Sequence, residues 1–203
     1  MRRILAFTAP LLLLIFASAA PVSAQQSTTR GLNLGLHLGG ASLTVEDGDS
    51  HNAGGGGLWI GYGFNRTVQL FLQLDGHQFD VQDAAVEGDW TMGHADLGVR
   101  FHFANSLRSW VPYLQVALSG RAVEVTNGAI NDAAQSDNIS LVGGGLTLGG
   151  GIIFYFTESL GLDLQLDWTG GSFTTIEVGS VSYSDLDLDA QSARFNIGLS
   201  WWP

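Results

Sequence analysis

Cysteine and lysine are absent from this chain, and each absence excludes a class of function. Without cysteine there is no disulfide framework and no thiolate metal site. All eight basic residues are arginines, against 19 acidic residues, and the formal net charge at pH 7 is −11. Such a chain has no basic surface for phosphate groups, so we expect no nucleic-acid partner.

Proline and charged residues are also scarce, whereas glycine is abundant. Only 4 prolines occur among 203 residues, charged residues make up 13% of the chain, and 28 residues are glycine. Many leucines and aromatic residues accompany the glycines, and this composition favours strands over helices. The glycine runs at residues 54–57 and 143–145 lack the Lys-Ser/Thr of a phosphate-binding loop, so we expect no cofactor.

The first segment has the pattern of a secretory signal peptide. Arg2 and Arg3 precede an apolar run over residues 4–20, and small residues lead to a predicted cleavage site after Ala24. The run is short for a bilayer-spanning helix, which is the alternative interpretation. We therefore predict a signal peptide over residues 1–24 and a single domain over residues 25–203.

Strict alternation of apolar with polar or small residues dominates the rest of the chain. A period of two is typical of a strand with one apolar face. The alternating segments cover residues 32–39, 59–64, 68–75, 94–103, 112–119, 146–156, 160–168 and 193–201. The non-apolar face carries mostly Gly, Gln, Asn and Ser with a few charges, which suits a narrow polar interior better than a solvated exterior.

Segment and connection lengths indicate a membrane barrel. Each segment is about ten residues long, which is the length that a tilted strand needs to cross the hydrocarbon layer. The sheet must also be closed, because unpaired backbone groups at a sheet edge are costly in lipid. Long connections near residues 43–54, 79–89, 125–140 and 170–188 alternate with short ones at residues 65–66, 104–109 and 157–159. Several aromatic residues near the strand ends, including Trp90, Trp168 and Trp202, fit the two membrane interfaces. We predict an all-β, eight-stranded antiparallel up-and-down transmembrane β-barrel.

The chain resembles the small outer-membrane β-barrel proteins of the OmpA/OmpX type. The signal peptide, the eight alternating segments and the final residues 195–203 carry the resemblance, which covers the whole mature chain. It implies the outer membrane of a Gram-negative bacterium, contact with outer-membrane lipid and lipopolysaccharide, and insertion by the barrel-assembly machinery. That machinery recognises a terminal aromatic residue in the family, whereas Pro203 ends this chain. We expect a monomer, because a closed barrel has no free sheet edge.

Seven charged residues fall on the predicted inner face. Because side chains just fill the lumen of an eight-stranded barrel, these charges must pair there. We interpret them as a structural network of ion pairs and hydrogen bonds, with a gate in a narrow pore as the alternative. They are Asp75, Asp96, Arg100, Arg121, Asp163, Asp167 and Arg194.

We expect the long connections to be the outer loops and the short ones to be periplasmic turns. Acidic residues concentrate in and around these outer loops: Glu46, Asp47, Asp49, Asp80, Asp83, Glu87, Asp89, Glu124, Asp132, Asp137, Glu177, Asp185, Asp187 and Asp189. Asp185, Asp187 and Asp189 share one parity and form a weak candidate site for a divalent cation, although their spacing matches no calcium-loop motif. His77 and His94, with Asp75 and Asp96 two positions away, could orient a base in a lipid A-modifying enzyme, but no serine is placed beside them. We predict a non-catalytic structural or surface-interaction protein. The alternatives are a narrow pore, the lipid A-modifying enzyme and a soluble ligand-binding barrel.

Overall fold

The computed structural model describes residues 29–45, 48, 50–79, 86–103, 109–130, 137–178 and 181–203. The predicted signal peptide lies outside these ranges. Within them, no helix is long and apolar enough to span a bilayer. The strands are β1 (Gly31–Val45), β2 (His51–Gly63), β3 (Val68–Phe79), β4 (Val86–His102), β5 (Trp110–Ile130), β6 (Asp137–Tyr155), β7 (Leu160–Val178) and β8 (Val181–Trp201).

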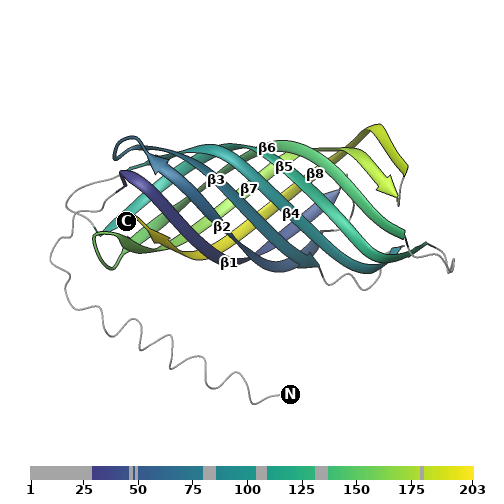
Figure 1. Ribbon diagram of the computed structural model, residues 1–203, viewed down its shortest axis with the longest axis horizontal. Coiled ribbons are helices and arrows are strands. Elements are labelled where there is room, and N and C mark those ends of the chain that lie inside the picture. Colours follow the sequence, from purple (N-terminus) through teal and green to yellow (C-terminus); the bar gives the residue numbers. More distant parts are fainter. Residues whose placement is uncertain are drawn as a thin grey trace, which may run out of the picture.

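The eight strands form one closed antiparallel barrel in which each strand pairs with its neighbours in the sequence (Figure 1). Closure comes from β1 and β8, where Leu36 lies opposite Leu199 and Leu38 lies opposite Ile197. Because the strand number is even, β1 begins and β8 ends at the same end of the barrel. The predicted fold class is therefore confirmed.

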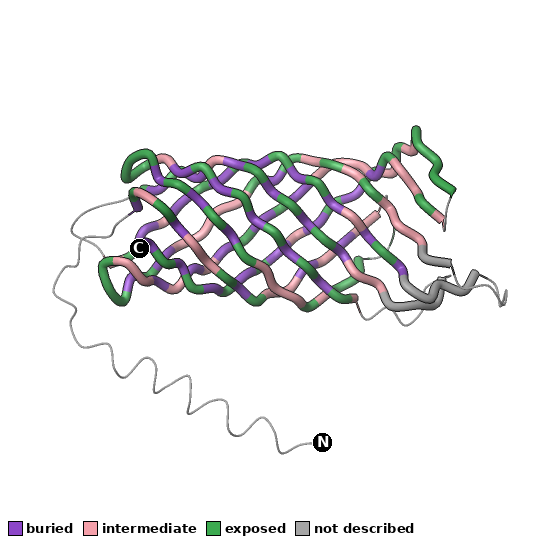
Figure 2. Tube along the Cα trace, viewed as in Figure 1, coloured by how far each residue is buried: buried purple, intermediate pink, exposed green. Residues whose placement is uncertain are grey.

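The apolar face of every strand points outward. Leu70, Leu97 and Ile197 are exposed and Leu164 is half-buried, whereas inward-facing residues on the same strands, such as Arg100 and Arg194, are fully buried. Exposed and buried positions alternate along the strands in Figure 2. This pattern is typical of a barrel surrounded by lipid, because a soluble barrel would bury its leucines in the interior.

The strands extend further than the alternation predicted. β5 and β8 each have 21 residues and β6 and β7 each have 19, about twice the length needed to cross the hydrocarbon layer. The prediction of a long loop over residues 170–188 was wrong, because this segment forms the paired ends of β7 and β8, joined at residues 179–180. Backbone pairing continues beyond the apolar band wherever two antiparallel strands already lie side by side, and hydropathy alone does not show this.

Most acidic residues assigned to the outer loops therefore lie on strands. Glu87, Asp89, Glu124, Asp137, Glu177, Asp185, Asp187 and Asp189 belong to β4, β5, β6, β7 or β8. Glu46, Asp47, Asp49, Asp80, Asp83 and Asp132 lie outside the described residues. The acidic character thus belongs to the strands of the barrel as well as to their connections.

The lumen is layered, which corrects the expectation of a polar interior throughout. At the end where β7 and β8 are joined, an outer apolar cluster includes Leu43, Met92, Val123 and Phe173. At the other end, an inner apolar cluster contains Val111, Tyr113, Ile153, Tyr155 and Trp202. Mainly polar side chains, together with Trp59 and Phe71 beside Arg100, fill the space between the two clusters.

Two tryptophans predicted at the membrane interfaces belong to these layers instead. Trp202 is only 1% exposed inside the barrel, and Trp90 packs against the outer apolar cluster. Trp168, by contrast, is exposed on the outer wall.

Candidate functional site: the polar network of the lumen

The structure places all seven of the predicted charged residues inside the barrel. Each has at most 6% of its surface exposed. They come from five strands: Asp75 from β3, Asp96 and Arg100 from β4, Arg121 from β5, Asp163 and Asp167 from β7, and Arg194 from β8. Because these residues alternate with outward-facing apolar residues, all seven side chains point to the inner face of the barrel.

Arg194 is the centre of the network. Its guanidinium pairs with Asp75 through Nη1 and with Asp96 through Nη2, the second at 2.6 Å. His37 Nε2 also lies 2.7 Å from Asp75 Oδ1. Arg194 Nη2 is 3.2 Å from the hydroxyl of Thr169. One arginine therefore joins β8 to β3 and β4 across the lumen.

Arg100 forms a second cluster nearer the inner apolar cluster. Its Nη1 lies 3.3 Å from Asp163 Oδ2, and its Nε donates a hydrogen bond to Gln115 Oε1 at 2.9 Å. The guanidinium carbon lies 4.1 Å from the centre of the Tyr113 ring, and the Tyr113 hydroxyl donates to Asp163 Oδ1 at 2.7 Å. Ring stacking and the ion pair together hold the guanidinium in one plane.

Neutral side chains that were not among the predicted site residues complete the network. Asp167 accepts hydrogen bonds from Gln115 at 2.6 Å and from Gln165 at 2.5 Å. Ser119 and Thr147 surround Asp96 in the same way. These residues share the inward parity of the charged ones, so parity was the signal that could have identified them.

Of the three arginines, Arg121 is the one that pairs with no carboxylate in the described part of the chain. Its Nη2 donates to the backbone carbonyl of Ala190 at 2.8 Å, and its guanidinium carbon lies 5.1 Å from the centre of the Phe173 ring. It lies where the polar layer meets the outer apolar cluster.

The histidines considered for an enzyme are inside the barrel as well. His77 and His94 are 2% and 3% exposed, and Ser192 Oγ lies 3.5 Å from His94 Nε2. Local spacing in the sequence does not reveal this serine, because it lies almost a hundred residues from His94. The pair is enclosed by the lumen, whereas an acyl chain of lipid A would approach from the outer wall.

The three aspartates proposed for a cation are exposed on β8. Asp185 adopts φ 74° where the β7–β8 ladder shifts register, so the continuous row expected from parity is interrupted there. Among the described residues, no three His, Asp or Glu side chains come together as a possible metal site.

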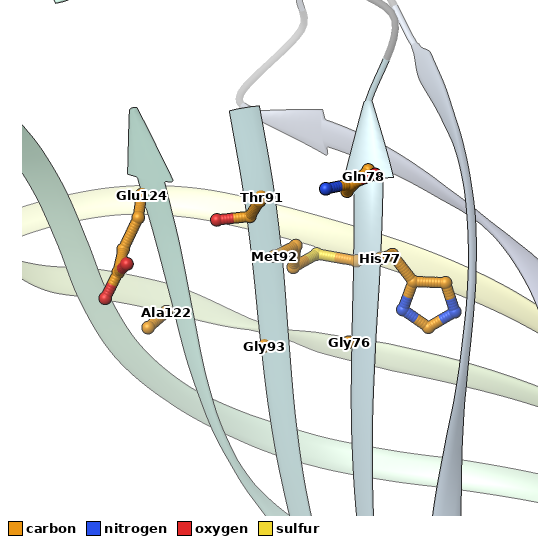
Figure 3. A pocket seen from close by; sticks show the side chains of 8 residues that line it. All are labelled: Gly76, His77, Gln78, Thr91, Met92, Gly93, Ala122 and Glu124. Carbon is orange, nitrogen blue, oxygen red and sulfur yellow. The ribbon is translucent and has the colours of Figure 1, made fainter. Parts of the chain in front are cut away.

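A hollow of about 340 Å³ lies on the outer wall where β3, β4 and β5 adjoin (Figure 3). Outward-facing Gly76, Gly93 and Ala122 leave this space open, and Gln78, Thr91 and Glu124 border it. Two inward-facing residues, His77 and Met92, also line the hollow.

Residues 9–201 match the family described as "Outer membrane protein beta-barrel domain". The chain belongs to this family. It is thus an outer-membrane β-barrel of the small eight-stranded type, and it resides in the bacterial outer membrane. No curated protein sequence matches the chain.

Three solved outer-membrane structures have similar folds. Neisserial surface protein A has a TM-score of 0.59 and 14% identity, over 84% of this chain and 96% of that chain. OprG from Pseudomonas aeruginosa has a TM-score of 0.57 and 14% identity, over 87% and 97%. Ail, the attachment invasion locus protein of Yersinia pestis, has a TM-score of 0.54 and 12% identity, over 85% and 100%. At these identities the similarity concerns the fold.

Proposed function

We propose that this barrel is a non-catalytic surface-interaction protein that contacts cationic partners through the acidic outer end of its strands. The observation that supports this proposal is the extension of β5–β8 beyond the apolar band. Exposed Glu124, Glu177, Asp185, Asp187 and Asp189 lie on this extension. Glu124, Glu177 and Asp189 lie at paired positions of the sheet. Carboxylates gathered at one end of the barrel attract cationic partners.

The filled lumen supports a role at the surface rather than transport. The polar network is closed by an apolar cluster at each end. Side chains of an eight-stranded barrel occupy the whole interior. A narrow pore would require several of these packed groups to move together.

The burial of the Ser192–His94 pair supports a non-catalytic role. A hydrolase needs its nucleophile within reach of a substrate, and here both residues are almost fully buried.

The experiment compares the protein with an Asp185→Asn/Asp187→Asn/Asp189→Asn variant, each in phospholipid nanodiscs. The probe is poly-L-lysine, and heparin is the oppositely charged comparison. We expect the protein to bind poly-L-lysine and not heparin, with affinity falling as salt rises. The variant should bind at least several-fold more weakly. Glu158→Gln, in the exposed turn at the opposite end, is the matched control and should change binding little.

Two outcomes would contradict the proposal: equal binding by the protein and the triple variant, or equal binding by empty nanodiscs. A second arm repeats the comparison in membranes that contain lipopolysaccharide, with calcium or with a chelator. We propose that the three aspartates share calcium with lipopolysaccharide phosphates. A calcium-dependent gain in thermal stability that the triple variant lacks would support this, and an identical gain in both proteins would exclude it.

A further inference from the structure

Beyond the apolar band, the paired ends of β6, β7 and β8 have one apolar face. In one row of this face, Val178 of β7 lies opposite Ile139 of β6 and Val181 of β8. A second row lies beside it, because residues two apart along a strand share a face of the sheet. We call the six side chains the tip face: Ile139, Leu141, Ile176, Val178, Val181 and Tyr183.

The tip face continues the inner surface of the barrel, but it becomes uncovered towards β8. Val123 of β5 belongs to the outer apolar cluster and lies opposite Leu141, which packs against that cluster. Val123 is 1% exposed and Leu141 is half-buried, whereas Tyr183, in the same row on β8, is 61% exposed. In Figure 1 the joined ends of β7 and β8 project from the end of the barrel opposite the C-terminus.

The apolar residues of this tip point to the opposite side from those of the membrane wall. Along the wall they point outward to lipid, whereas on the tip the outward row consists of Ser140, Glu177 and Ser182. A sheet with one apolar and one polar face is typical of a sheet that packs against a second element. An uncovered apolar face bordered by polar residues therefore indicates an interaction surface.

The chain's own outer connections offer little to cover the tip face. Residues 46–50, 80–85 and 131–136 contain Val81 as their only apolar residue larger than alanine. The same three segments contain six acidic residues and no basic one. Placing them on the tip would bring like charges together beside the exposed Asp185 and Asp187, which is unfavourable. A separate partner suits the face better.

Charge at the tip favours a cationic partner. No arginine, lysine or histidine occurs between Arg121 and Arg194, a stretch that contains all of β6 and β7 and most of β8. The exposed Asp185 and Asp187 follow the tip face along β8. A segment with basic side chains beside an apolar stripe would complement both the face and its acidic border.

We propose that the tip face docks a cationic amphipathic helix supplied by a partner protein. Three strands spaced by about 4.8 Å present a face roughly 10 Å wide, which is about the diameter of one helix. The apolar stripe of the helix packs on the tip face, and lysine or arginine side chains at the border of the stripe reach Asp185 and Asp187. The inference rests on the proposed function, because it specifies which cationic partner the acidic outer end selects.

The test follows Tyr183 itself, with the protein labelled with 3-fluorotyrosine in phosphatidylcholine nanodiscs. A Tyr183→Phe variant identifies the ¹⁹F resonance of this residue. The probe is a peptide of leucine and lysine in the order of an amphipathic helix, and a peptide of the same composition in scrambled order is the charge-matched comparison. We expect the amphipathic peptide to shift the resonance with saturation and to bind at least about tenfold more tightly than the scrambled one, as burial of one apolar side chain predicts. Free peptide is corrected for binding to empty nanodiscs.

A Val178→Thr/Val181→Thr variant keeps the shape and the strand propensity of two residues that lie opposite each other. It should lose most of the preference for the amphipathic peptide while still binding the scrambled one through charge. Val142→Thr, at an exposed apolar position on the opposite face of β6, is the matched control and should keep the preference.

Equal affinity for the two peptides would overturn the inference and leave the proposed function standing, because charge alone would then explain the binding. A Tyr183 resonance that does not shift with the amphipathic peptide would also overturn it, and the poly-L-lysine experiment then decides the proposed function separately. A resonance that moves when the protein is diluted without peptide would show that a second copy covers the face, which again contradicts the inference.

Discussion

At the scale of single residues, Arg194 shows how the interior is held together. Its partners Asp75 and Asp96 lie on β3 and β4, 119 and 98 residues away in the sequence. All three side chains are nearly or fully buried. A buried ion pair contributes modestly when complete, but its loss is severe when one partner goes, because an unpaired charge stays in the interior.

Replacing Arg194 by Met should therefore destabilise the folded barrel by about 3–5 kcal/mol. The free energy of unfolding is measured by urea titration of the protein in lipid vesicles. The further changes Asp75→Asn and Asp96→Asn in the same chain should recover part of the loss, because they remove the uncompensated carboxylates.

Arg66→Ala, in the exposed turn between β2 and β3, is the matched control and should leave stability nearly unchanged. A barrel that resists urea equally well with Arg194→Met would show that the network contributes little to stability.

At the scale of strands, the steric need for glycine differs between the inner and the outer face of the barrel. A Cβ added at Gly35, on the inner face of β1, would lie 2.0 Å from Cζ2 of Trp59. That indole is fixed, because its Nε1 donates a hydrogen bond to Asn33 Oδ1 at 2.7 Å. A Cβ added at Gly76, on the outer face of β3, would meet nothing within 4 Å. Glycine is thus sterically required at Gly35 and is not required at Gly76.

We expect Gly35→Ala to destabilise the barrel by about 1–3 kcal/mol, the usual cost of overpacking. Gly76→Ala should be neutral or stabilising, because alanine loses less backbone entropy than glycine on folding. Urea midpoints of the two variants in the same vesicles provide the comparison. Equal losses in both would mean that the two glycines act through strand propensity rather than packing.

At the scale of the whole molecule, the layered lumen determines what the barrel can pass. Tyr113 and Trp202 belong to the inner apolar cluster, Phe173 belongs to the outer one, and the paired charges lie between them. An ion crossing the barrel would have to enter an apolar layer, break the network and leave through a second apolar layer. Each step is unfavourable in a low-dielectric interior.

We expect the folded protein to produce no discrete conductance steps in planar lipid bilayers at moderate voltage. The folded state of each sample is checked by its faster migration in a detergent gel before boiling than after. A large porin added to the same bilayer serves as the positive control. Reproducible steps from the folded form would contradict the closed lumen and favour the narrow pore.

Much of the architecture could be predicted from the sequence because it depends on local alternation. Parity assigned Leu70, Leu97 and Ile197 to the lipid face and Arg100 and Arg194 to the lumen, since successive side chains of a strand point to opposite faces. The same rule failed beyond the apolar band: no change in hydropathy marks where the pairing of β7 and β8 stops, so residues 170–188 were taken for a loop.

By itself, then, the sequence determined a closed eight-stranded barrel with apolar side chains outward and seven charged residues inward. Only the tertiary structure decided which charges meet. Asp163 with Arg100, Asp75 with Arg194, and Arg121 without a carboxylate all result from register and closure, which bring strands distant in the sequence to one level of the lumen. The physical reason is that strand parity is a property of neighbouring residues, whereas pairing inside a barrel depends on the relative height of strands across its axis.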